Sequence, residues 1–151
     1  MNLVWYTTGE NVLKKVLFLC TANASRSQMA AGLVNHDFSG RVQALSAGTN
    51  PKGISTLAVQ VLLEIGIDIR AETSKHMRQY ENERFDYAIT LCDQANEQCP
   101  VFFGGVQRLH MGFPDTPHTS VANEENLQIY REIRDLIRGR MTEFFNRELA
   151  I

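Results

Sequence analysis

The chain has 151 residues, a formal net charge of −2 and 44% hydrophobic residues. This length and composition predict one ordinary globular domain, and without a basic excess we expect no nucleic acid partner. The start of the sequence lacks the features of a signal peptide, and its apolar runs are too short to span a membrane. We therefore expect a cytoplasmic protein without a membrane contact, whose three cysteines are catalytic or redox-active rather than structural cross-links.

Strands and helices are predicted to alternate along the chain, after an N-terminal extension that covers residues 1–14. The hydrophobic pattern and its capping residues predict strands at 15–19, 42–46, 87–91 and 106–109, and helices at 28–37, 55–65 and 123–149. This alternation indicates an α/β fold, with a single domain over residues 15–151, a central four-stranded parallel sheet and helices on both faces. An active site is then expected at the carboxyl ends of the strands.

The loop after the first strand combines a nucleophile with an arginine. Cys20 follows the apolar run 16–19, and Arg26 comes after five small or polar residues. Short side chains let successive backbone N–H groups converge, and the helix beginning near Ser27 adds its positive end. Arg26 can bind two oxygens of one anion, and these positive surroundings favour the Cys20 thiolate. We interpret the segment as a phosphate-binding loop that holds a tetrahedral oxyanion, formed by Thr21, Ala22, Asn23, Ala24, Ser25, Arg26 and Ser27.

A simpler interpretation of this loop is a buried thiol at a strand end beside a surface arginine. The placement of both residues at a strand-to-helix turn favours the oxyanion site.

The other two cysteines follow the third predicted strand. Cys92 ends the apolar run 87–91, and Cys99 follows after six residues of mostly polar character. Because parallel strands deliver their carboxyl ends to one edge of a sheet, Cys92 can approach Cys20. A pair of buried small hydrophobes is the alternative. A zinc site is disfavoured because the three cysteines lack the closely spaced pairs of such sites, so we favour a relay between thiols.

Asp115 lies in a loop after the fourth predicted strand, within the segment 112–117. By itself, an aspartate between prolines is most often a turn former. The histidines have no ligand-like spacing and are interpreted as surface or packing residues: His36, His76, His110 and His118.

Several motifs together resemble one family. The segment 16–32 is similar to arsenate reductases built on the low-molecular-weight protein tyrosine phosphatase fold, and so are the segments 46–49, 66–69, 91–100 and 112–115. The similarity covers essentially the whole chain after Lys14, so that residues 15–151 would form a catalytic domain of this kind. Within that superfamily, the pair Cys92 and Cys99 resembles the thioredoxin-coupled reductases.

The resemblance implies a reaction. Cys20 would attack arsenate held by the loop amides and Arg26, with phosphate or sulfate as analogues, while Asp115 protonates the departing hydroxyl. Cys92 would then attack the sulfur of Cys20 and release arsenite. Cys99 would move the disulfide outward to the pair Cys92–Cys99, where thioredoxin reduces it. No cofactor is implied.

Some positions depart from the family pattern. Ser25 stands where relatives commonly carry a second loop cysteine. Some reductases of this group bind potassium beside the loop. Asn23 and Ser46 fit that ligand set, but Ala31 and Lys75 stand where carboxylates would be. We therefore expect no metal, and the ammonium of Lys75 in the electrostatic role of the ion.

The alternative function is a low-molecular-weight protein tyrosine phosphatase, which would use the same nucleophile, arginine and acid through a phosphocysteine intermediate. Phosphatases of this fold line their phenol slot with aromatic residues after the segment 48–49 and beyond the acid, and this chain has none there. Gln28 also stands where phosphatases typically have proline. A non-enzymatic phosphate-binding module would leave Cys92 and Cys99 without a role. Residual phosphatase activity remains compatible with the reductase.

Overall fold

The fold consists of one sheet and its covering helices. The computed structural model describes residues 13–93, 97, 99–102 and 107–150. Its strands are β1 (Lys14–Cys20), β2 (Val42–Gly48), β3 (Tyr87–Thr90) and β4 (Gln107–His110). Its helices are α2 (Arg26–Asp37), α3 (Thr56–Leu63), the short 3₁₀ helix η1 (Met77–Tyr80) and α4 (Glu124–Glu148). Most of the predicted extension lies outside the described residues, which begin at Leu13.

The sheet has four parallel strands in the order β2-β1-β3-β4, which confirms the predicted four-stranded parallel sheet. β1 lies inside the sheet, and its residues 16–19 are fully buried. An unbroken apolar run fits a parallel strand that is covered on both faces. Because all four strands point the same way, the segments that follow β1, β3 and β4 meet at one edge.

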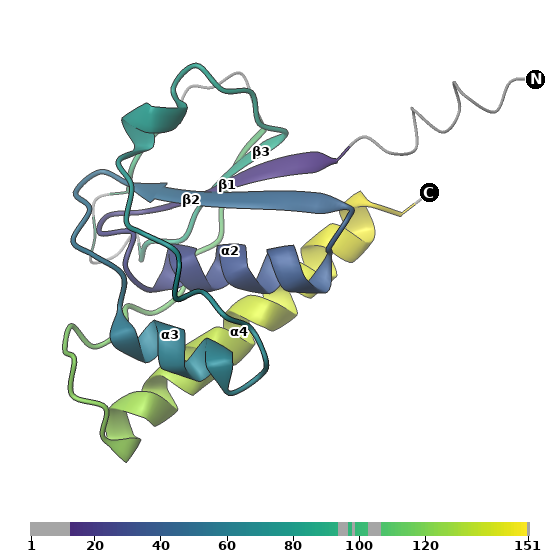
Figure 1. Cartoon of the computed structure of the whole chain (residues 1–151). Helices are drawn as coiled ribbons and strands as arrows, with labels where there is room; N and C mark the ends of the chain where they lie inside the picture. Colours follow the sequence, from purple (N-terminus) through teal and green to yellow (C-terminus); the bar gives the residue numbers. More distant parts are fainter. Residues whose placement is uncertain (1–12, 94–96, 98, 103–106, 151) are drawn as a thin grey trace, which may run out of the picture.

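The two faces of the sheet are covered differently. Val16 and Phe18 belong to a core shared with α2, α3 and α4, which lie together on one side of the sheet in Figure 1. Leu17 and Leu19 point to the other side, where they pack with Phe85 and the flank of η1. Among the described residues, the expected helical cover of this second face is therefore the 3₁₀ helix η1 together with loops rather than α-helices.

Helix α4 crosses the whole helical layer. The apolar stripe predicted for it is buried, at Leu127, Tyr130, Ile133, Ile137, Met141 and Phe144. The Asn123 side chain caps its first turn by accepting the N–H of Asn126 at 2.8 Å. In the described part of the chain, no helix combines the length and apolar character needed to cross a membrane.

Two element boundaries matter for the site. Helix α2 begins at Arg26, two residues before the predicted start, so Arg26 and Ser27 lie in its first turn. Strand β2 extends to Gly48, beyond the predicted end at 46. A Cβ atom at Gly48 would lie 2.3 Å from the carbonyl oxygen of Thr21, so only glycine permits this close approach of β2 to the loop after β1.

Candidate active site

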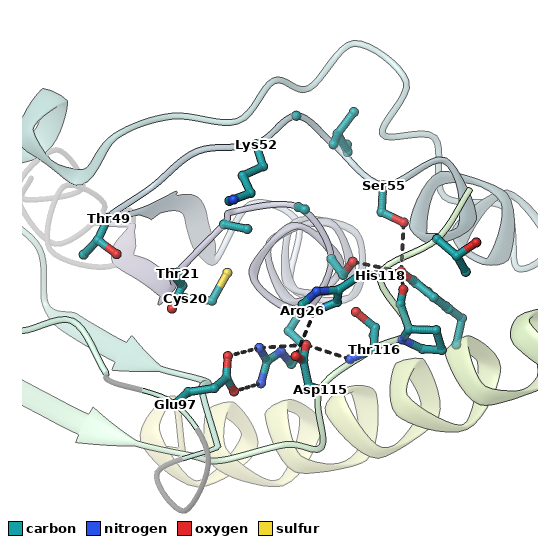
Figure 2. A pocket seen from close by; sticks show the side chains of 18 of the residues that line it. Cys20, Thr21, Arg26, Thr49, Lys52, Ser55, Glu97, Asp115, Thr116 and His118 are labelled. Atoms are coloured by element: carbon teal, nitrogen blue, oxygen red, sulfur yellow. Dashed lines mark hydrogen bonds and ion pairs between the residues drawn. The ribbon is translucent and has the colours of Figure 1, made fainter. Parts of the chain in front are cut away.

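The loop between β1 and α2 lines a cavity of about 1170 Å³ at the carboxyl edge of the sheet (Figure 2). Of the residues predicted for the oxyanion site, those that line the cavity are Cys20, Thr21, Ala22, Ala24, Ser25 and Arg26. Asn23 and Ser27 are fully buried and support the loop through hydrogen bonds. Cys99 and Asp115 line the same cavity, so the fold brings together residues from three separate loops.

The backbone of the loop is held from outside. Its carbonyl groups accept N–H groups of the segment that leads into α3: Thr21 O from Asn50 at 2.8 Å, Ala22 O from Lys52 at 3.1 Å and Ala24 O from Ser55 at 2.9 Å. The C=O and N–H bonds flanking a trans peptide bond point in opposite directions. Carbonyls that are held outside therefore turn the amide N–H groups toward the cavity, which is the arrangement that binds an anion.

Cys20 is a free, buried thiol at the base of this loop. Its Sγ accepts the backbone N–H of Asn23 at 3.2 Å and lies 2.9 Å from Oγ of Ser27. The Ser27 hydroxyl accepts an N–H from the Asn23 side chain at 2.8 Å, which leaves its own O–H available to the sulfur. An N–H and an O–H donor thus converge on the sulfur, and both stabilise a thiolate.

Asn23 supports the loop through the hydrogen bonds of its side chain. Its backbone has φ +50°, in the left-handed region that asparagine tolerates better than most residues. Its Oδ1 accepts the backbone N–H of Lys75 at 2.8 Å and an N–H of Gln28 at 3.2 Å. The Lys75 ammonium instead binds the carbonyl of Thr73 at 2.6 Å. The Asn23 oxygen, at one of the positions that match the potassium ligand set, thus already accepts two N–H donors.

Arg26 lies at the centre of the site, buried among acceptors. Its Nη1 and Nη2 atoms each donate to one carboxylate oxygen of Glu97 at 2.7 Å. Nη2 also lies 3.1 Å from Oδ1 of Asp115, and Nη1 donates to the carbonyl of Phe113 at 3.1 Å. Burial lowers the pKa of Arg26, but the hydrogen bonds to Glu97 and the charges of both carboxylates raise it by more. The same hydrogen bonds hold the pKa of Glu97 below its ordinary value.

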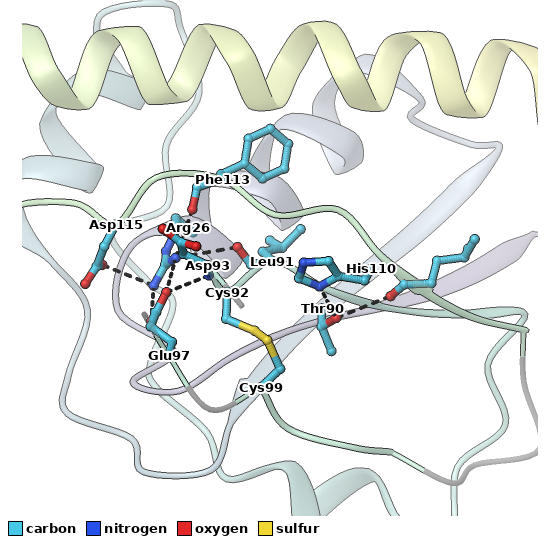
Figure 3. Close-up of a disulfide and its surroundings, with 11 residues drawn as sticks. Arg26, Thr90, Leu91, Cys92, Asp93, Glu97, Cys99, His110, Phe113 and Asp115 are labelled. Atoms are coloured by element: carbon cyan, nitrogen blue, oxygen red, sulfur yellow. Dashed lines mark hydrogen bonds and ion pairs between the residues drawn. A yellow bond between two sulfur atoms is a disulfide. The ribbon is translucent and has the colours of Figure 1, made fainter. Parts of the chain in front are cut away.

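The other two cysteines are joined in a disulfide (Figure 3). Cys92 is completely buried, whereas Cys99 is partly exposed and lines the cavity. A ring nitrogen of His110, which was expected to be a surface or packing residue, lies within 4.8 Å of both sulfurs. The two sulfurs are bonded to each other beside this imidazole.

Asp115 lines the cavity beside Arg26 and is exposed. Its Oδ1 accepts the N–H of Thr116 at 2.8 Å, and its Oδ2 lies 2.8 Å from Nε2 of His118. His118, which is exposed as expected of a surface residue, also lines the cavity. Its position three residues after Asp115, in the same loop, is the one signal in the sequence that pointed to it.

Two further residues of the site were not predicted from the sequence. Glu97 was treated only as part of the polar stretch between the cysteines, and nothing in its spacing indicates the pairing with Arg26. Tyr130 was assigned to the apolar stripe of α4, but its hydroxyl connects three other segments through hydrogen bonds. It donates to the Pro117 carbonyl at 3.0 Å and lies 3.1 Å from Oγ of Ser55 and 3.2 Å from Oγ of Ser25.

Comparison with known proteins agrees with this geometry. The low molecular weight phosphotyrosine protein phosphatase family matches residues 15–150. An arsenate reductase of Shouchella clausii is 36% identical over 131 residues, which cover 87% of this chain and 94% of that protein. The arsenate reductase of Bacillus subtilis is 35% identical over 131 residues, with the same coverage of 87% and 94%.

Solved structures show the same relationship. A thioredoxin-dependent arsenate reductase of Corynebacterium glutamicum superimposes with a TM-score of 0.65 at 27% identity, over 95% of this chain and 66% of that one. The order of the motifs, the fold and the loop between β1 and α2 all lead to one assignment. The chain belongs to the low molecular weight phosphotyrosine protein phosphatase family.

Proposed function

We propose that this enzyme reduces arsenate to arsenite, with Cys20 as the nucleophile and Cys92 and Cys99 as a disulfide relay. The observation that carries the proposal is the shared cavity. A free thiol at the base of an anion-binding loop and one sulfur of a disulfide open onto the same space. A phosphatase needs the first of these features but has no use for the second. The relatives named arsenate reductase support the same choice.

The first step uses the loop and the opposite wall. The Cys20 thiolate attacks arsenic, an As–S bond forms, and one hydroxyl leaves as water after protonation by Asp115. The inward N–H groups of the loop and the Arg26 guanidinium stabilise the negative charge on the remaining oxygens. The position of its carboxyl at the cavity wall, 3.1 Å from Nη2 of Arg26, supports this role for Asp115.

The second step transfers electrons. A Cys92 thiolate attacks Sγ of Cys20, and the S–As electron pair passes to arsenic, which is reduced from As(V) to As(III) and leaves as arsenite. The two sulfurs are oxidised to a Cys20–Cys92 disulfide. Cys99 then attacks Cys92 and returns Cys20 to its thiolate. The disulfide between Cys92 and Cys99, with Cys20 free, corresponds to the end of this sequence.

A dithiol of the thioredoxin type completes the cycle in this proposal. Cys99 is the more exposed sulfur of the pair, and thiol–disulfide exchange begins at the sulfur that the incoming thiolate can reach. A thioredoxin pool and reduced thiols are found together in the cytoplasm, which is where we propose that the enzyme acts.

The donor is tested by following arsenate-dependent NADPH oxidation with thioredoxin and its reductase, and in parallel with glutaredoxin and glutathione. We expect sustained oxidation only in the first mixture. Turnover through glutaredoxin alone would contradict the proposed donor while leaving arsenate reduction intact.

The relay is tested by two substitutions. Cys92→Ser is expected to abolish arsenate turnover but to keep weak hydrolysis of an aryl phosphate, because only reduction needs a second sulfur. Cys99→Ser is expected to release arsenite once per molecule and then stop as a Cys20–Cys92 disulfide, which mass spectrometry of the linked peptides detects. If the protein is a phosphatase, both variants should hydrolyse phosphotyrosine as well as the parent.

A further inference from the structure

The Glu97 carboxylate occupies the edge of the Arg26 guanidinium that a bound oxyanion needs. Its two carboxylate oxygens accept one N–H each from Nη1 and Nη2 of Arg26, both at 2.7 Å. This parallel pair of charge-assisted hydrogen bonds is the geometry with which arginine binds a phosphate or arsenate. The carboxylate therefore takes the contacts that a bound oxyanion would make with this edge of Arg26 (Figure 3).

The remaining N–H bonds of these two nitrogens are also engaged. Nη1 donates to the Phe113 carbonyl at 3.1 Å, and Nη2 lies 3.1 Å from Asp115. Two carboxyl groups thus surround a single guanidinium, and the Glu97 carboxylate already neutralises its charge at the side of the cavity where the anion should bind. An incoming dianion has to displace at least one of them, and it meets electrostatic repulsion until it does.

Glu97 lies within the loop that the disulfide closes. Glu97 lies between Cys92 and Cys99, whose Cα atoms are held 5.8 Å apart by the bond. Two hydrogen bonds to Asp93 hold it further: Glu97 donates its N–H to the Asp93 carbonyl at 2.8 Å, and its side chain accepts the Asp93 N–H at 2.7 Å. Reduction removes the covalent constraint at the far end of this segment, and with it the entropic advantage that holds Glu97 on Arg26.

We propose that Glu97 is an internal occupant of the oxyanion site, held on Arg26 when the Cys92–Cys99 disulfide is closed and released when it is reduced. The inference rests on the proposed function, because it assigns the oxyanion to Arg26. Its consequence is an ordered cycle. The oxidised enzyme, which has no relay thiols to finish the reaction, excludes arsenate, and the site opens only after both thiols are restored.

Phosphate binding tests this gate without turnover. All proteins carry Cys20→Ser, so that Cys92–Cys99 is the one disulfide they can form, and each is titrated with inorganic phosphate in a calorimeter in its oxidised and reduced forms. The parent is compared with Glu97→Gln and Glu97→Ala. Glu81→Gln is the matched control, because this exposed glutamate at the end of η1 does not line the cavity.

We expect the oxidised parent and the Glu81→Gln control to bind phosphate about 10-fold or more weakly than their reduced forms, a coupling of ordinary size. In Glu97→Ala the two forms should bind within about 3-fold of each other, with Glu97→Gln between Glu97→Ala and the parent, because an amide keeps one acceptor but no charge. The reduced forms of all four proteins should bind alike, which also shows that the variants are folded.

Equal binding by the two forms of the parent, or persistent weak binding by oxidised Glu97→Ala, would overturn the gate and leave the proposed reductase activity standing. A gate that behaves as expected in an enzyme that fails to reduce arsenate would overturn the proposed function alone. Failure of every reduced protein to bind phosphate would overturn both.

Discussion

The two walls of the cavity are built differently. The loop from Cys20 to Ser27 is held through its backbone, with successive carbonyls bound from outside and its central residue Asn23 buried. The opposite wall, which carries Glu97, Asp115 and His118, meets the cavity through side chains that are partly or largely exposed and are held by ion pairs. Backbone contacts resist displacement of the chain, whereas ion pairs exchange partners readily.

This difference matches the two tasks of the proposed reaction. Binding an anion requires preorganised donors that do not move during the reaction. Relaying a disulfide requires movement, because sulfurs bond only at about 2 Å and no fixed geometry places Cys92 that close to both Cys20 and Cys99. In the proposed reaction, the wall formed by the loop from Cys20 to Ser27, the rigid wall, thus holds the substrate. The wall that carries Glu97, Asp115 and His118, the side-chain wall, contributes the groups that have to rearrange. Four substitutions measure how far this division holds.

The largest effect is expected at the base of the rigid wall. Cys20→Ser replaces a thiolate with a hydroxyl that stays protonated at neutral pH, so arsenate reduction should fall by at least ~10³-fold and aryl phosphate hydrolysis should be lost with it. Phosphate binding to the reduced protein should survive, because the loop amides and Arg26 are unchanged. Retained turnover in this variant would exclude Cys20 as the nucleophile.

Arg26→Lys is expected to have the next largest effect, since it removes a bidentate donor from the junction of the two walls. The loss of a single oxyanion donor costs about 2.7–4 kcal/mol elsewhere, so kcat should fall by ~10²–10³-fold. The fold should persist, which circular dichroism checks. Near-normal kcat would mean that another cation anchors the substrate, and Lys52, which lines the cavity, is then the first to replace.

Asn23→Ala tests how much the Asn23 side chain stabilises the loop from Cys20 to Ser27. It removes the hydrogen bonds to Ser27, Lys75 and Gln28 and places a residue that lacks the asparagine side chain at φ +50°. We expect a loss of ~1–3 kcal/mol in the free energy of unfolding, measured by urea denaturation. Asn126→Ala is the control, because this half-buried asparagine in the first turn of α4 donates from its side chain to the Val121 carbonyl and does not line the cavity. Equal losses at the two positions would argue against a special role for the Asn23 side chain.

Tyr130→Phe is expected to have the smallest effect and tests how the walls are connected. Its hydroxyl joins Ser25 of the loop to the Pro117 carbonyl beside Asp115. Its removal should cost ~0.5–1.5 kcal/mol of stability. It should lower kcat more than it raises the KM for arsenate, since the acid loses its fixed distance to the substrate. Tyr80→Phe on the second face of the sheet is the control, and a matching kinetic change there would refute the connection.

The sequence predicted the loop wall, Cys20 to Ser27, better than the side-chain wall. Strand periodicity located β1, and the small residues between Cys20 and Arg26 indicated the loop, because both signals are local in the chain. The pairing of Glu97 with Arg26 depends on two segments 71 positions apart, and no local pattern encodes it. The Tyr130 hydroxyl was hidden for a similar reason, since its ring fits the apolar stripe of α4 and only the fold shows what its oxygen touches.

The close approach at Gly48 has a consequence for how the protein opens. The Thr21 carbonyl packs closely on Gly48 of β2, and the segment that follows β2 is hydrogen-bonded to the loop carbonyls, so separating the loop from this part of the fold breaks those bonds. The amides of Asn50, Lys52 and Ser55, which are bonded to the loop carbonyls, should therefore exchange with deuterium as slowly as those of the sheet core. Loop and sheet then form one cooperative unfolding unit, and the anion site disappears only when the whole domain unfolds.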